Sequence, residues 1–96
     1  MHKAPDQYLP NADVRCIQLD HVTVLSAPHI DQHATLSATG EEVWALLHER
    51  RSTVDRLVMA MAKRYSGQAL ADIPERVIEQ LDSFVSQGFV RRVADA

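Results

Sequence analysis

The sequence has few of the residues that brace small proteins or build loop-based active sites. Its single cysteine, Cys16, excludes an internal disulfide, so the stability of the fold has to come from an apolar core. Its three glycines, Gly40, Gly67 and Gly88, lie far apart in the chain. A phosphate-binding loop needs glycines close together, so this distribution excludes a glycine-rich nucleotide site.

A strong excess of charge and long apolar runs are also missing. The formal net charge of −3 provides no general attraction to nucleic acid or to an anionic membrane. No apolar run approaches the ~20 residues that a membrane-spanning helix needs, and the first residues contain no apolar signal-peptide core. We therefore expect a soluble, cytoplasmic protein without a nucleic-acid or membrane partner.

The 96 residues are enough for one small domain with a modest core. Residues 1–12 include Pro5, Pro10 and Asn11 and show no periodicity, which predicts a flexible N-terminal arm. The folded domain is expected over residues 13–93, with a β-rich first part and an α-helical second part.

Three short strands are predicted in the first part of this domain. Residues 13–18 alternate weakly, residues 22–26 are rich in β-branched and apolar side chains, and residues 32–36 form a short third strand. Turns over residues 19–21 and 28–31 connect them. Strands joined in this order form an antiparallel meander, which has to lay one face on helices to be stable.

The first of three predicted helices follows the third strand. Thr39 and Glu42 have the spacing of a capping box, in which each side chain satisfies a backbone N–H at the helix start. Val43, Trp44 and Leu47 then share one helical face. We expect Trp44 to be a core anchor and not a ligand contact.

Two further helices complete the prediction. The second starts at the cap Ser52 and ends at residues 66–67, with an apolar stripe made of Val54, Leu57, Val58, Met61 and Tyr65. The third starts at Asp72 with Pro74 in its first turn and ends at Gly88, before a short wing-like extension over residues 89–93. Its inner stripe is Val77, Ile78, Leu81, Phe84 and Val85. The expected fold is α+β, a three-stranded antiparallel sheet followed by three helices, in an order that resembles a winged helix-turn-helix.

One cluster has a spacing that suggests metal binding. His29, Asp31 and His33 would share one face of an extended strand, and two imidazoles with a carboxylate are possible Zn²⁺ ligands. Pro28 and Asp31 indicate a turn, however, and no second cluster supplies a fourth ligand. We predict no metal site.

Residues that could act in catalysis have simpler structural roles. Cys16 falls in a predicted strand, where a cysteine is more often a small buried apolar residue than a nucleophile. Glu41 and Glu42 lie in a first helical turn, where they favour the helix N-terminus electrostatically. We predict no catalytic residue and no cofactor.

A helix that follows a small sheet also suggests DNA binding. In a winged-helix regulator the third helix would enter the major groove. Its polar side, however, carries one basic residue, Arg76, and four acidic residues, Asp72, Glu75, Glu79 and Asp82. Phosphate contacts dominate the affinity for nucleic acid, so this helix disfavours DNA, and a DNA-binding regulator remains the alternative of a different class.

The last strand of the meander is expected to have an unpaired edge. Such an edge is either a liability that the protein has to cover or a template on which a peptide adds as a new strand. The residues alone leave both readings open.

Several segments together resemble the PqqD family, the stand-alone recognition elements for precursors of ribosomally made, post-translationally modified peptides. The segments are Val24–Pro28, Leu36–Leu47, Thr53–Asp55, Tyr65 and Gly88–Val90. The resemblance extends over roughly residues 13–92.

The resemblance implies a domain that does no chemistry. A precursor's leader peptide would dock as an added strand on the third strand, in a groove shared with the third helix. The domain would then deliver the precursor to a radical SAM enzyme in PQQ and related pathways, or to a leader peptidase in lasso-peptide pathways. The expected peptide-binding residues are Gln32, His33, Ala34, Thr35 and Leu36 on the strand, Val77, Leu81 and Phe84 in the groove, and Arg76 and Gln80 at its rim.

Overall fold

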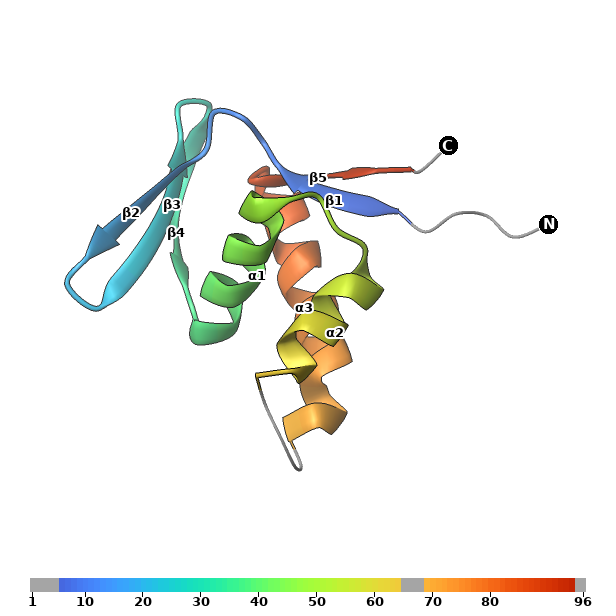
Figure 1. The fold of residues 1–96 in the computed structure, drawn as a ribbon. Helices are drawn as coiled ribbons and strands as arrows, with labels where there is room; N and C mark the ends of the chain where they lie inside the picture. The colour runs from blue at the N-terminus through green and yellow to red at the C-terminus, as the bar shows by residue number, and fades with distance from the viewer. Residues whose placement is uncertain (1–5, 65–68, 95–96) are drawn as a thin grey trace.

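The computed structural model describes residues 6–64 and 69–94 and contains two small sheets and three helices (Figure 1). A three-stranded antiparallel sheet lies beside the helices. A two-stranded sheet, made from segments near the two ends of the chain, lies across one end of the helices. The predicted α+β class, with a three-stranded antiparallel sheet that precedes three helices, is therefore confirmed.

The three-stranded sheet consists of β2 (Arg15–Leu19), β3 (Val22–Ala27) and β4 (Ile30–Leu36), in that order. Tight turns connect them, and Asp20 in the first turn adopts a φ of 52°. Leu25 and Ala27 on β3 face the core, and an intermediate position such as Val24 faces outward. The order of the three strands is the predicted meander, but β4 begins at Ile30, inside the predicted turn over residues 28–31.

Part of the predicted N-terminal arm over residues 1–12 differs from the prediction, while residues 1–5 of it lie outside the described residues. Residues Gln7–Pro10 form β1, which pairs antiparallel with β5 (Val90–Val93). Tyr8 is buried, and its backbone also exchanges hydrogen bonds with Ser52, at N···O distances of 2.8 and 3.0 Å. Asn11 fixes the end of the strand, because its side-chain amide donates to the carbonyl of Gly88. The pairing partners lie about 80 residues apart in sequence, so no local pattern could reveal this strand.

The cap of α1 (Ala38–Glu49) lies two residues before the predicted one. Ser37 is the N-cap: its backbone is extended, and its Oγ accepts a hydrogen bond from the N–H of Gly40 at 3.1 Å. The prediction that Thr39 caps this helix is wrong. The helix begins directly where β4 ends, so Ser37 is the residue at the change of backbone direction.

The other two helices also start at residues different from the predicted ones. Thr53, not Ser52, caps α2 (Val54–Ala62), with its Oγ1 accepting from the N–H of Arg56 at 3.2 Å. Ser52 is instead held in its bridge with β1. The longest helix, α3 (Ala69–Gln87), starts before Asp72 and carries Pro74 in its interior. The predicted end of the second helix at residues 66–67, and Tyr65 in its stripe, lie outside the described residues.

One core joins all three helices to both sheets. The predicted inner stripes supply most of it: Val43, Trp44 and Leu47 from α1, Leu57 and Met61 from α2, and Val77, Leu81 and Phe84 from α3. Trp44 is buried and meets Phe84 edge to face, with ring centroids 5.8 Å apart. Ile78, which was expected in the inner stripe, is exposed.

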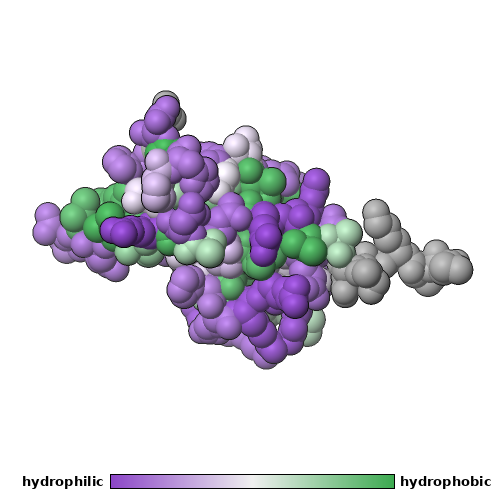
Figure 2. Space-filling view, turned by 90° about the horizontal axis from the view of Figure 1, so that it is seen from above, coloured by the Kyte–Doolittle hydropathy of each residue, from purple (hydrophilic) through white to green (hydrophobic). Residues whose placement is uncertain are grey.

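The hairpin of β2 and β3 is the least covered part of the fold. Ile17, Leu19 and Val22 are exposed, and hydrophobic residues gather at the end of the molecule where the hairpin lies (Figure 2). Within the described ranges, no helix is both long and apolar enough to cross a membrane.

Candidate functional site

Strand β4 forms one edge of the three-stranded sheet. It pairs with β3, and no other strand of the described residues pairs with its outer side. An edge strand presents a row of backbone N–H and C=O groups that accept a further strand. The polar flank of α3 runs beside this edge, as the lining of two surface hollows shows. The edge and the helix together form a groove, which we call the β4–α3 groove.

The edge of β4 is regular only at its second half. Ala34, Thr35 and Leu36 pair in register with Leu25, Val24 and Thr23. Nearer the turn, Ala27 pairs with Ile30, so residues 31–33 form a bulge between the two registers. A bulge interrupts the hydrogen-bond ladder between two strands and changes the direction in which the side chains point. The regularly paired part of β4 is therefore Ala34–Leu36, which is shorter than the predicted peptide-binding segment over residues 32–36.

A hollow of about 400 Å³ occupies the turn end of the groove. Ile30 and Ala34 contribute apolar surface from β4, and Phe89 contributes it from behind the end of α3. The polar members are Asp31 and His33 from the bulge and Ser86 and Gln87 from the helix. This end of the groove fits an apolar side chain that is surrounded by hydrogen-bonding groups.

A second hollow, of about 220 Å³, occupies the other end of the groove. It lies where β4 passes into α1, and its lining is polar throughout: Ser37, Thr39, Arg76, Glu79, Gln80 and Ser83. Hydroxyl, amide, carboxylate and guanidinium groups provide both donors and acceptors there. The groove therefore offers one partly apolar and one polar site along the same edge.

Two glycines allow close contacts at the ends of the groove. A Cβ atom at Gly40 would lie 3.0 Å from Oε1 of Gln80, so α1 approaches α3 closely at the polar end. Gly88 has a φ of 87°, a conformation that favours glycine, and it ends α3 beside Ile30. These contacts set the width of the groove.

The structure divides the ten predicted site residues into two groups. Gln32, His33, Ala34, Thr35 and Leu36 all lie on β4, and Arg76 and Gln80 line the polar hollow. Val77 and Leu81 are 0% exposed and Phe84 is 1% exposed, so these three form the core beneath the groove. They support the groove wall from behind and do not form its surface.

The surface that α3 turns toward β4 includes residues that were not among the ten predicted site residues. Glu79, Ser83, Ser86 and Gln87 line the two hollows with Arg76 and Gln80. These six positions recur at intervals of three and four residues and form a polar stripe beside the apolar stripe of α3. The sequence contained this signal, but only the position of β4 identifies which flank of the helix borders the groove.

The candidate metal residues do not converge. His29 lies in the turn, where its Nδ1 atom is 2.8 Å from Oδ2 of Asp13. No group of three His, Cys, Asp or Glu residues in the described ranges is arranged to hold a metal ion. Cys16 is exposed rather than buried as predicted. Partial burial and the nearby Glu41 carboxylate raise the pKa of its thiol, which disfavours the nucleophilic thiolate.

The comparison with protein-family models matches residues 23–90 to coenzyme PQQ synthesis protein D (PqqD). The match extends from β3 through the three helices to the start of β5, more than two thirds of the chain. The chain belongs to the PqqD family. The comparisons with curated proteins and with solved structures give no significant match.

Membership confirms the resemblance that the sequence motifs indicated. The PqqD family takes part in the biosynthesis of PQQ and of ribosomally made peptides. It is a family of accessory recognition proteins, and its partners are of two kinds, a precursor peptide and the enzyme that matures it. The β4–α3 groove lies within the matched residues.

Proposed function

We propose that this protein is a non-catalytic peptide chaperone that binds the leader of a precursor peptide as an added strand on β4. The bound precursor is then presented to a maturation enzyme, either a radical SAM enzyme or a leader peptidase. The free edge of β4 beside the polar flank of α3 is the observation that carries this proposal. Main-chain pairing with Ala34–Leu36 would supply affinity, and the two hollows would supply selectivity.

The arrangement of a small sheet before three helices supports a winged helix-turn-helix-like classification, but the charges of α3 disfavour DNA. Asp72, Glu75, Glu79 and Asp82 are exposed on this helix, and Arg76 is its one cation. Carboxylates repel the phosphate groups on which non-specific DNA affinity depends. A peptide backbone that pairs with an edge strand meets no such repulsion.

A titration monitored by backbone amide NMR tests the function. Leader peptides encoded near the gene are added to the isotope-labelled protein, and a scrambled peptide of identical composition serves as the control. We expect the largest shifts at residues 34–36 and along residues 76–87 with the true leader only. The proposal is wrong if no leader shifts these signals, or if the scrambled peptide shifts them equally. A salt-sensitive mobility shift with duplex DNA in that case would favour the DNA-binding alternative.

A further inference from the structure

The opposite edge of the three-stranded sheet borders a second open region, between β2 and α1. Two adjoining hollows of about 510 and 320 Å³ lie there, and both are lined by Cys16, Trp44 and Ala45. Because they share these three residues, we treat them as one surface and call it the β2–α1 hollow. It shares no α3 residue with the β4–α3 groove, and Leu36 is the one residue of β4 in its lining. Strand β2 lies outside the residues that match the family.

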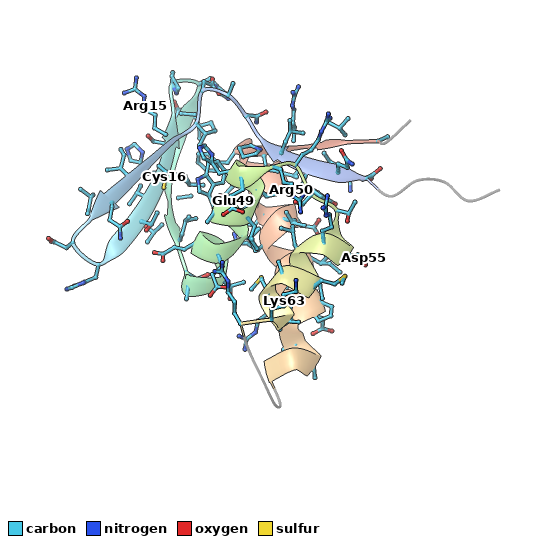
Figure 3. All side chains as sticks on the ribbon, viewed as in Figure 1. Arg15, Cys16, Glu49, Arg50, Asp55 and Lys63 are labelled. Carbon is cyan, nitrogen blue, oxygen red and sulfur yellow. The ribbon has the colours of Figure 1, made fainter. Side chains whose placement is uncertain are left out.

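The β2–α1 hollow is open because little covers β2. This strand pairs with β3 alone among the described residues, and all five of its residues are exposed. The hairpin stands away from α1, and Cys16 lies on the side of β2 that faces this helix while Arg15 points away (Figure 3). Monomeric proteins rarely expose a strand that carries apolar side chains, has an unpaired edge and is uncovered on its inner face.

The chemistry of the lining indicates what would cover it. Val14, Trp44 and Ala45 form an apolar floor. Three carboxylates from α1 surround this floor, Glu41, Glu42 and Glu49, together with the cation Arg64. Arg64 already lies 3.8 Å from Glu42, so the rim keeps an excess of negative charge. Such a surface complements a segment that carries apolar side chains together with lysine or arginine.

A second copy of this chain does not supply that chemistry through the same strand. Residues alternate between the two faces of a strand, so the inner face of β2 carries Cys16 and Gln18, with Val14 just before the strand. None of these bears a positive charge. Arg15, the one cation of β2, lies on the other face (Figure 3).

We propose that the β2–α1 hollow docks a basic, apolar segment of the maturation enzyme. This inference rests on the proposed function, because a protein that presents a peptide to an enzyme has to bind both at once. The peptide edge β4 and the enzyme edge β2 are the two outer strands of one three-stranded sheet. Both partners then bind without competing for the same backbone groups.

The chain carries two built-in reporters of this surface. Its single tryptophan, Trp44, and its single cysteine, Cys16, both line the hollow. The experiment measures the affinity of the purified maturation enzyme encoded with this protein, and the rate at which iodoacetamide alkylates Cys16. We expect saturating enzyme to slow the alkylation of Cys16 severalfold, whereas saturating leader peptide leaves the rate unchanged.

Two variants test the lining directly. Ala45→Arg adds bulk and positive charge to the floor, and Glu49→Lys reverses a rim charge; each is expected to weaken enzyme binding by about tenfold or more. Glu75→Lys is the control for Glu49→Lys, because it makes the same change of net charge on the exposed side of α3. It is expected to leave the enzyme affinity within about twofold of the wild-type value. All three variants should retain leader affinity and wild-type circular dichroism, because none lies in the β4–α3 groove.

Three results overturn this inference, two of them from the enzyme measurements. One is an enzyme affinity that Ala45→Arg leaves unchanged, and the other is an enzyme complex in which Cys16 reacts as fast as in the free protein. A concentration-dependent dimer that Ala45→Arg abolishes would also overturn it, because a second copy would then be the occupant. A wild-type protein that binds the enzyme but no leader would overturn the proposed function and leave the β2–α1 inference intact.

Discussion

Trp44 shows at the residue scale how one side chain serves both the core and a surface. Its ring packs edge to face on Phe84 and stacks on His48 with ring centroids 6.1 Å apart, and the residue is buried. It also lines the β2–α1 hollow. Its position on the apolar face of α1 was predictable from helical spacing, but its place in the lining of the hollow depends on where β2 lies relative to α1.

Replacing Trp44 tests its role as the core anchor. We expect Trp44→Ala to lower the free energy of unfolding by ~3–5 kcal/mol, because the substitution removes buried contacts and leaves a cavity. Chemical denaturation monitored by circular dichroism measures this loss. Met59→Ala is the control, since Met59 is exposed and its loss should change stability by less than about 0.5 kcal/mol. Wild-type stability in Trp44→Ala would contradict the assignment.

The two candidate caps of α1 provide a second test at the residue scale. Ser37→Ala removes the oxygen that accepts from the N–H of Gly40 and is expected to destabilise the protein by ~1 kcal/mol. Thr39→Ala removes no cap and is expected to have a smaller effect. Thermal denaturation of the two variants distinguishes the observed cap from the one that the capping-box spacing predicted. A larger loss in Thr39→Ala would support the predicted cap instead.

At the scale of elements, the bulge in β4 determines which part of its edge is regular. The register with β3 shifts across its residues 31–33, and its residues 34–36 pair regularly. Neither the bulge nor the neighbouring flank of α3 could be predicted from the strand's own residues. A bulge depends on how β3 and β4 match around their turn, which is a property of the pair.

A pair of proline substitutions on β4 tests the added-strand model. Alternate N–H groups of an edge strand point to the neighbouring strand and to the free side, so Ala34 and Thr35 point their N–H groups in opposite directions. One of Ala34→Pro and Thr35→Pro should break the ladder with β3 and lower stability, because proline lacks an N–H. The other should fold normally and bind leader peptide at least about tenfold more weakly, through loss of a main-chain bond.

Calorimetric titration with the leader peptide and thermal denaturation are measured on both proline variants. The model requires the two variants to differ in this way. Leader affinity that stays unchanged in the well-folded variant would exclude pairing at residues 34–36.

At the scale of the whole molecule, two strands from near the ends of the chain close the fold together. β1 and β5 pair with one another, and β1 also bridges to Ser52 just before α2. Tyr8, Phe89 and Val90 belong to the common core. Residues 7–10 are therefore part of the folded domain, which was expected to begin at residue 13.

A chain that begins at residue 13 tests this closure. It lacks β1, leaves the backbone of β5 unpaired and removes the buried side chain of Tyr8. We expect it to lose at least about 2 kcal/mol of stability, the scale of one buried large side chain. Chemical denaturation measures the loss, and equal stability of the shortened and full chains would show that β1 contributes nothing to the domain.

The sequence alone determined the features that depend on neighbouring residues. Weak alternation in residues 13–18 and β-branched, apolar side chains in residues 22–26 indicated the meander. Three- and four-residue spacing indicated most of the inner stripes of the helices, and several segments, among them Leu36 to Leu47, together indicated the family. It also predicted correctly that β4 would be the last strand of the sheet.

Only the tertiary structure decided the features that depend on distant partners. β1 exists because β5 lies beside it, and Ser37 caps α1 because β4 ends there. The surface of α3 that borders the groove is its polar stripe, because the residues of its apolar stripe, Val77, Leu81 and Phe84, are buried in the core. Periodicity identifies which residues share a face, but the packing of all the elements determines what each face meets.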